Sequence, residues 1–148
     1  MVTYVYNFDI MKKIVIIWLL CLSFPVIAAA QTPDYKVVFD LTSKDPNVQQ
    51  SVIRWLNGIS KSDPDAQMEV VLYGKSLDMV VKDRSSVAED VIKLAENKNI
   101  AFRVCAVAMK HQNISESQLL PGVKTVPDGI YEIIAKQKEG WGYIKAVQ

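Results

Sequence analysis

The sequence has little of the chemistry that most metal and cofactor sites require. It contains one histidine and two cysteines in 148 residues, and these cannot complete a tetrahedral ligand set without carboxylates at defined spacing. It also lacks a P-loop, a dinucleotide-binding glycine motif, a nucleophile elbow and a C-x-x-C pair. We therefore expect no metal and no cofactor. Any covalent chemistry has to use the few reactive side chains that are present.

The chain also has almost no excess charge, with a formal net charge of +1. Lys12, Lys13 and Asp9 are the charged residues of the first thirty, so the rest carries 15 basic and 15 acidic residues. A neutral domain has no electrostatic attraction for nucleic acid or for an anionic membrane surface. We expect neither of them as a partner.

The first thirty residues have the pattern of a secretory signal peptide. Met11-Lys12-Lys13 is a basic start, Ile14 to Leu22 is an unbroken apolar run, and Ala28-Ala29-Ala30 supplies small residues for cleavage. The apolar run is about half of the roughly twenty residues that a membrane-spanning helix needs. We predict that residues 1–30 are an N-terminal extension plus a cleaved signal, with translation starting at Met11 and cleavage near Ala30. The product is then an exported, periplasmic protein.

Cleavage leaves the mature chain with one thiol, because Cys21 lies in the leader. Cys105 then has no intramolecular partner. An unpaired cysteine in an oxidising compartment is either buried and inert or kept for thiol chemistry. Lys110 and His111 lie nearby and could stabilise a thiolate. Val104 and Ala106, beside the cysteine, are apolar neighbours of the kind that surround an inert cysteine in a protein core. The residues alone leave both readings open.

Residues 31–148 predict one domain of the α/β class. Short apolar runs alternate with amphipathic segments, as expected when helices cover both faces of a mainly parallel sheet. We therefore expect three α/β/α layers around about five strands. The predicted strands are 35–41, 68–73, 100–106, 123–126 and 141–147.

Helix boundaries follow from capping residues and breakers. Asp45-Pro46 begins a helix whose apolar face runs to Ile59, and we expect Asn57-Gly58 and the polar stretch that follows to stop it. A capping box at Ser86 to Glu89 opens the next helix, and Ser115 with Gln118 forms a second box over a short turn. Asp128 caps the last helix. Its inward face is predicted to hold Ile130, Ile133 and Ile134.

The functional crevice of such a sheet lies beyond the carboxyl ends of its strands. We predict a ligand-binding crevice with Asp40 and Thr42 after the first strand and Gly74 after the second. Cys105 at the end of the third strand is the candidate catalytic thiol. Lys110 and His111 are candidate helpers in the connection that follows.

Five motifs occur in order between Tyr35 and Ala146: VVFDLTSKDP, MEVVLYG, IAFRVCAVAM, VPDGIYEIIAKQ and EGWGYIKA. With them the sequence resembles the DsrE/DsrF-like family, and especially its small stand-alone members. The resemblance implies a three-layer fold of flavodoxin-like architecture with a parallel sheet, and a homo-oligomer. It also implies a sulfur relay that carries sulfur as a cysteine persulfide.

The same resemblance assigns positions. Cys105 matches the sulfur-carrying cysteine, and Gly74 matches the glycine that closes the second strand beside the site. Small members commonly place a polar Asn-Thr or Asn-Ser pair one residue after the cysteine. Val107-Ala108 stands there in this chain, so two hydrogen-bonding groups are missing from the expected site.

Three functional hypotheses follow. The first is an exported sulfurtransferase-like carrier that binds or relays persulfide sulfur on Cys105, with a thiol or persulfide protein as its partner. The second is a non-catalytic small-ligand-binding or oligomeric interaction module in which the cysteine is inert and buried. The third is a flavodoxin-like cofactor protein, for which Thr42-Ser43-Lys44 is only a weak match to a phosphate-binding turn.

Overall fold

A computed structural model describes residues 34–147. The predicted start at Met11, the signal sequence and the cleavage position near Ala30 lie outside these residues, so those predictions stay as they are. Within residues 34–147, none of the helices has both the length and the apolar composition needed to cross a membrane.

Five strands and four helices alternate along the described chain, and two short 3₁₀ turns connect them. The strands are β1 (Lys36–Leu41), β2 (Gln67–Leu72), β3 (Ile100–Cys105), β4 (Lys124–Val126) and β5 (Gly142–Ala146). The helices are α2 (Pro46–Ser62), α3 (Ala88–Ala95), α4 (Ala106–His111) and α5 (Gly129–Lys138), and the turns are Ser76–Val80 and Glu116–Gln118. Each strand lies within one residue or so of the predicted apolar run.

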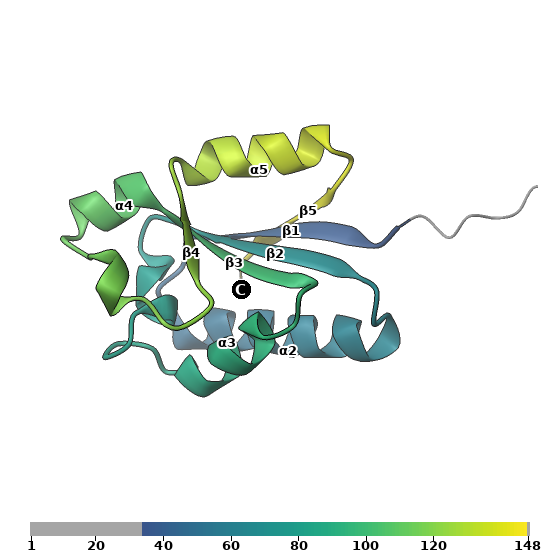
Figure 1. Ribbon diagram of the computed structural model, residues 1–148, viewed down its shortest axis with the longest axis horizontal. Helices are drawn as coiled ribbons and strands as arrows, with labels where there is room; N and C mark the ends of the chain where they lie inside the picture. The colour runs from purple at the N-terminus through teal and green to yellow at the C-terminus, as the bar shows by residue number, and fades with distance from the viewer. Residues whose placement is uncertain (1–33, 148) are drawn as a thin grey trace, which may run out of the picture. The chain divides into compact units, whose positions relative to one another are not determined.

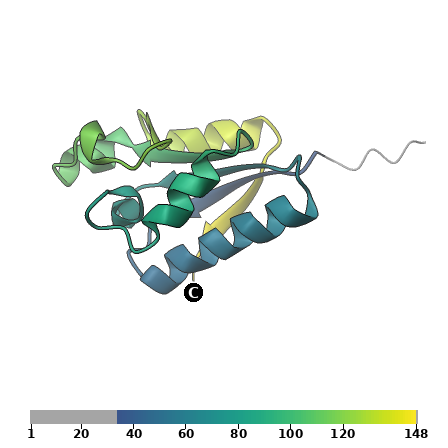
Figure 2. The same cartoon turned by 60° about the horizontal axis from the view of Figure 1, so that its bottom comes forward.

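All five strands are parallel, in the order β4-β3-β2-β1-β5. The chain moves in one direction from β1 to β4, so right-handed crossovers put α2 and α3 on one face. The connection from β4 to β5 runs back across the sheet and puts α5 on the other face. Figure 1 shows the sheet between these two layers, and Figure 2 shows α2 and α3 side by side. The predicted three-layer α/β/α fold is confirmed.

Helix α2 extends one turn further than predicted. Asp45 caps it as expected, accepting a hydrogen bond from the Asn47 amide at 2.8 Å. The helix continues through Gly58 and the first polar residues after it to Ser62, so the predicted end is three residues too early. Ile59 packs against the core one residue beyond the glycine, and this burial outweighs the cost of an interior helical glycine, about 1 kcal/mol.

Two other local predictions need correction. The capping box at Ser86 does not form: α3 begins at Ala88, its N-cap residue Val87 makes no side-chain cap, and the Val87 amide donates to Ser85 Oγ at 3.2 Å. The connection after Cys105 is partly helical, because α4 occupies Ala106–His111. Met109 is buried in the main core and holds this short helix to the sheet.

The inward face of α5 is also different from the prediction. Asp128 caps the helix by accepting from the Ile130 and Tyr131 amides at 2.8 and 3.0 Å, as expected. Ile133 is buried, but Ile130 is 57% exposed and Ile134 is 44% exposed. The inward stripe starts instead at Gly129, which has no side chain and lets the helix approach the sheet closely.

Candidate functional site

The three strand ends expected to form the crevice are neighbours. Leu41 at the end of β1 pairs with Leu72 of β2, and Leu72 pairs with Val104 of β3. A cavity of about 510 Å³ opens at this edge of the sheet. It is lined by Tyr73, Gly74, Lys75, Cys105, Val107, Ala108, His111, Gln112, Asp128 and Ile130.

Cys105 lies where β3 ends and α4 begins, and it occupies the N-cap position of α4. It is the only cysteine among the described residues, it makes no disulfide, and it is 6% exposed. Helix α5 packs tightly beside it. A Cβ atom added to Gly129 would lie 3.2 Å from the Cys105 Cβ and 3.2 Å from Val71 Cγ1. The thiol is therefore enclosed on the helix side and reached through the cavity.

Gly74 connects the ends of β1 and β2 to α4. Its φ of +62° is in the region that favours glycine, and a Cβ added there would lie 3.6 Å from the Thr42 Cβ. The Thr42 carbonyl accepts from the Lys75 amide at 3.2 Å, and the Gln112 side chain donates to the Gly74 carbonyl. Gly74 lines the cavity, whereas Thr42 lies behind it and does not.

The two basic candidates occupy different positions. His111 ends α4 and lines the cavity that contains Cys105. Lys110 is an exposed residue of the same helix and is not part of the cavity wall. Their roles as helpers remain predictions, and of the two only His111 has the position for one.

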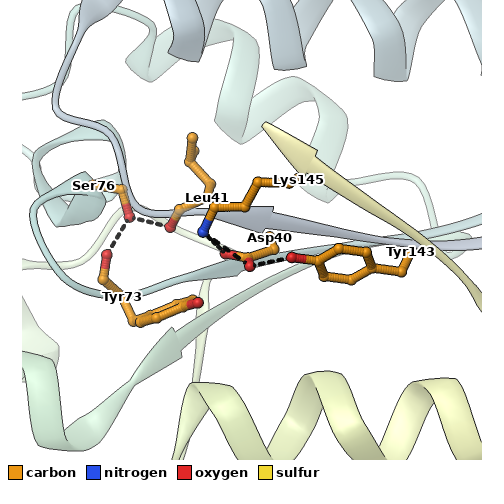
Figure 3. Close-up of polar contacts among 6 residues, drawn as sticks. All are labelled: Asp40, Leu41, Tyr73, Ser76, Tyr143 and Lys145. Carbon is orange, nitrogen blue, oxygen red and sulfur yellow. Dashed lines mark hydrogen bonds and ion pairs between the residues drawn. The ribbon is translucent and has the colours of Figure 1, made fainter. Parts of the chain in front are cut away.

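Asp40 is buried, with 4% of its surface exposed, and does not line the cavity. Its Oδ2 accepts from the Tyr143 hydroxyl at 2.7 Å, and Lys145 Nζ donates to both carboxylate oxygens at 2.9 and 3.0 Å (Figure 3). The bond to Asp40, together with burial and the carboxylate charge, raises the pKa of Tyr143 to about 12. Both oxygens of Asp40 therefore serve internal contacts, and its predicted role in ligand binding stays a prediction.

Tyr73, Tyr143 and Lys145 were missed by the sequence interpretation. Tyr143 and Lys145 alternate along β5, so both point to the α5 side of the sheet, as Asp40 does on the neighbouring strand. An acidic residue in the apolar run VVFDL was the available signal, because a buried carboxylate needs a partner. What the sequence did not reveal was where that partner lies, more than 100 residues away.

A second group of buried charges lies beneath α5. Glu69 of β2 is buried, with Arg103 Nε 3.6 Å and Lys136 Nζ 4.0 Å from its Oε2. Burial raises the pKa of Glu69 to about 7, and the neighbouring Glu132 adds to the increase, although Lys136 and Arg103 oppose it. Glu69 Oε1 has no hydrogen-bond partner among the described residues. A proton on this carboxyl would let it donate to Glu132.

A second cavity of about 490 Å³ lies on the opposite face, between α2 and β5. Its walls include Trp55, Ile144 and Phe39, whose ring stacks on Trp55 with centroids 6.0 Å apart. Arg54 is its one charged wall residue. This groove is apolar and separate from the thiol.

No cluster of three or more metal-ligating side chains is found among residues 34–147. The histidine and the described cysteine share a cavity wall whose one carboxylate, Asp128, caps α5. Besides Asp128, the wall thus supplies a thiol, an imidazole, a lysine, a phenol and an amide beside apolar side chains.

Comparison with known proteins gives a family and a fold. The DsrE/DsrF-like family model matches residues 36–146, which confirms the resemblance seen in the five motifs. No curated protein shows significant similarity to the chain.

Three solved structures share the fold. Protein MTH1491 from Methanobacterium thermoautotrophicum, of unknown function, is 28% identical with a TM-score of 0.71, over 76% of this chain and 99% of that one. The ychN protein from E. coli is 10% identical with a TM-score of 0.63, over 74% and 97% of the two chains. Protein BT1422 from Bacteroides thetaiotaomicron, also of unknown function, is 14% identical with a TM-score of 0.64, over 78% and 98%.

Proposed function

The chain belongs to the DsrE/DsrF-like family, and on that premise we propose that it carries sulfane sulfur as a persulfide on Cys105. The observation that supports this proposal is the position of the thiol. Cys105 is a free cysteine on the wall of a cavity at the carboxyl edge of the sheet, where α/β proteins of this kind place their functional residues.

The transfer needs no oxidant or reductant beyond the two thiol partners. The Cys105 thiolate attacks the outer sulfur of a donor persulfide, R–S–SH, so that a new S–S bond forms as the donor's S–S bond breaks. The donor leaves as a thiolate and takes up a proton. An acceptor thiolate then attacks the outer sulfur on Cys105 and regenerates the cysteine thiolate. Donor and acceptor are thiol or persulfide proteins, or small thiols.

The cavity suits a small, polarizable cargo. Val107, Ala108 and Ile130 form apolar walls near the thiol, and sulfane sulfur is itself weakly hydrated and soft. Lys75 and His111 contribute exposed basic groups to the same wall, and these can attract an anionic persulfide or polysulfide. The polar pair absent at Val107-Ala108 is thus replaced, in part, by groups from other elements.

Intact-mass measurement after exposure to sodium polysulfide tests this proposal. The wild type is expected to gain the mass of one or more sulfur atoms and to lose it on treatment with a reducing agent. Cys105→Ala is the matched control and should gain nothing. A wild-type chain that takes up no sulfur, or a Cys105→Ala chain that takes up as much, would show that the relay proposal is wrong.

The second candidate is a non-catalytic module for a small ligand or a partner. The near-complete burial of Cys105 and the separate apolar groove beside Trp55 favour it. It predicts that iodoacetamide alkylates the folded protein no faster than a core thiol. It also predicts that Cys105→Ala leaves ligand binding and assembly unchanged.

We also propose that the protein is exported and that it assembles as a homo-oligomer. The exposed side chains of α5 support the second point. Tyr131 and Ile134 are 71% and 44% exposed, and Ile130 at the mouth of the cavity is 57% exposed, so this helix presents an apolar surface. Light scattering on the secreted protein tests assembly. Tyr131→Asp should weaken assembly, and a monomeric wild type would contradict the homo-oligomer.

N-terminal sequencing tests export. A mature protein that begins upstream of Gln31 would contradict cleavage near Ala30.

A further inference from the structure

Both oxygens of the buried Asp40 carboxylate have hydrogen-bond donors from strand β5. Tyr143 and Lys145 of β5 already occupy both oxygens at 2.7 to 3.0 Å. Lys145 also balances the negative charge. Asp40 therefore keeps a hydrogen bond on each oxygen even if the Tyr73 hydroxyl turns away from it.

Tyr73 lies beside this cluster and lines the cavity, so it connects the two. Lys145 Nζ, which is bonded to Asp40, lies 5.6 Å from the centre of the Tyr73 ring. Figure 3 shows the Tyr73 ring beside the Asp40 carboxylate. Burial, the hydrogen bond to Asp40 and the charge of Asp40 raise the pKa of Tyr73 to about 12, so the phenol is neutral at physiological pH.

Tyr73 is also a neighbour of the thiol residue. Tyr73 and Cys105 line the same cavity. One point, the position of a Cβ added to Gly129, is 3.5 Å from the Tyr73 Cβ and 3.2 Å from the Cys105 Cβ, so the two side chains begin next to each other. An electrostatic interaction with Cys105 is the smallest of the causes that raise the pKa of Tyr73.

The backbone of Tyr73 is fixed on both sides. Its amide donates to the Leu41 carbonyl at 3.2 Å. Ser76, which is fully buried, lies with its hydroxyl 2.7 Å from the Leu41 carbonyl and 2.9 Å from the Tyr73 carbonyl and shares its proton between them (Figure 3). The position of the Tyr73 backbone at the strand end is therefore set by the fold, and the ring starts from a fixed point between Asp40 and the cavity.

We propose that Tyr73 donates a hydrogen bond to the sulfur anion on Cys105, and that Asp40 is a positioning residue that holds Tyr73 ready when the sulfur is uncharged. The inference rests on the proposed function. Lys75 and His111 are the other donors on this wall, and both are exposed to solvent. The Gln112 amide is used by Gly74, and Asp128 accepts from the start of α5. Tyr73 thus takes over the task of the polar pair that Val107-Ala108 does not provide.

Two tyrosine-to-phenylalanine variants test the inference, because each removes one hydroxyl from Asp40 and only one of them lines the cavity. In Tyr73→Phe, iodoacetamide alkylation of Cys105 at neutral pH and sulfur loading from sodium polysulfide should each slow about tenfold, the usual effect of losing a hydrogen bond to a charged group. The pH profile of alkylation should move to higher pH. In Tyr143→Phe, both rates should stay within about threefold of the wild type.

Asp40→Asn is a second variant that keeps the Tyr73 ring and removes the carboxylate charge. It should alter the same alkylation profile with the tertiary fold retained, as checked by near-ultraviolet circular dichroism. Equal rates in wild type and Tyr73→Phe, with sulfur still taken up by both, would overturn the role of Tyr73 and leave the relay standing. If alkylation and sulfur loading slow equally in Tyr73→Phe and Tyr143→Phe, the Asp40 cluster has only a structural role. No sulfur uptake by the wild type would remove the relay itself.

Discussion

The two faces of the sheet differ in the side chains that they bury. On the α2 and α3 side, twenty-five buried residues form one continuous apolar core. On the α5 side the buried apolar cluster has three members, Val38, Val71 and Ile133, and the same face carries the Asp40 and Glu69 charges and the Cys105 thiol. The first face supplies most of the stability, because apolar burial is the largest favourable contribution to folding. The second face is where polar and reactive groups can be accommodated.

Matched truncations in the two helices give the largest expected difference. Leu56 of α2 and Ile133 of α5 are both buried against the sheet. Leu56→Ala should lower the free energy of unfolding by about 3–4 kcal/mol and Ile133→Ala by about 2 kcal/mol, because the site can relax more easily in the smaller cluster. Urea unfolding followed by circular dichroism measures both. Equal losses would mean that the two layers are equally well packed.

Two helical glycines offer a sharper contrast. A Cβ at Gly129 meets Cys105 and Val71 at 3.2 Å, whereas a Cβ at Gly58 meets nothing within 4 Å. Gly129→Ala should therefore destabilise the protein by about 1–2 kcal/mol through overpacking, and it should change the alkylation rate of Cys105. Gly58→Ala should stabilise it by about 0.5–1 kcal/mol through helix propensity. Thermal unfolding of the two variants gives the sign of each effect, and a stabilising Gly129→Ala would contradict the close packing of α5.

The pH dependence of stability should come from the α5 face. Glu69 has a pKa of about 7 in the folded protein against an ordinary value of 4.5, so the folded state binds the proton more tightly than the unfolded state. Stability is then highest below pH 4.5 as far as this group is concerned, and falls as pH rises from about 4.5 to about 7, by an amount of order 1–2 kcal/mol. Glu69→Gln should flatten this part of the profile in urea titrations at several pH values.

Glu132→Gln is the companion variant to Glu69→Gln. It removes one cause of the raised pKa of Glu69 and should move the fall in stability to lower pH. A profile that keeps its slope in Glu69→Gln would assign the effect to another group.

The smallest effect on the free energy of unfolding is expected for an exposed ion pair. Arg84 Nη1 and Asp78 Oδ1 are 3.3 Å apart, and both side chains are nearly half exposed. Arg84→Ala should change the free energy of unfolding by at most about 0.5 kcal/mol, because exposed ion pairs are screened by water and salt. A loss above about 1 kcal/mol in a denaturant titration would show that this pair is coupled to the core.

The contrast between the faces also explains which parts of the fold were predictable. Strands β1, β2 and β3 were found from apolar runs because a central parallel strand is buried on both sides. The caps at Asp45 and Asp128 were found because they act on amides two or three residues away. The strands were predictable from the apolar composition of their own residues, and the caps from contacts between residues close in sequence.

The errors lie where distant packing decides. Ile130 and Ile134 have the right spacing for an inward stripe, yet the stripe that faces the sheet begins at Gly129, because close approach to Val71 and Cys105 fixes the rotation of the helix. No local pattern marks that approach. In the same way, His111 and Cys105 could be assigned to one edge of the sheet, but the position of Tyr73 beside Asp40 depends on strand β5 and could not be derived from sequence.

The position of strand β5 in the chain bears on the order in which the two faces of the sheet are completed. This strand comes last of the five strands along the chain, and its Lys145 meets Asp40 across 105 residues. Because a chain emerges from its N-terminal end, β5 is the last of these strands to become available for pairing. Until β5 pairs with β1, Asp40 lacks both Tyr143 and Lys145 as partners. The reactive side of the molecule is therefore completed after the side that stabilises it.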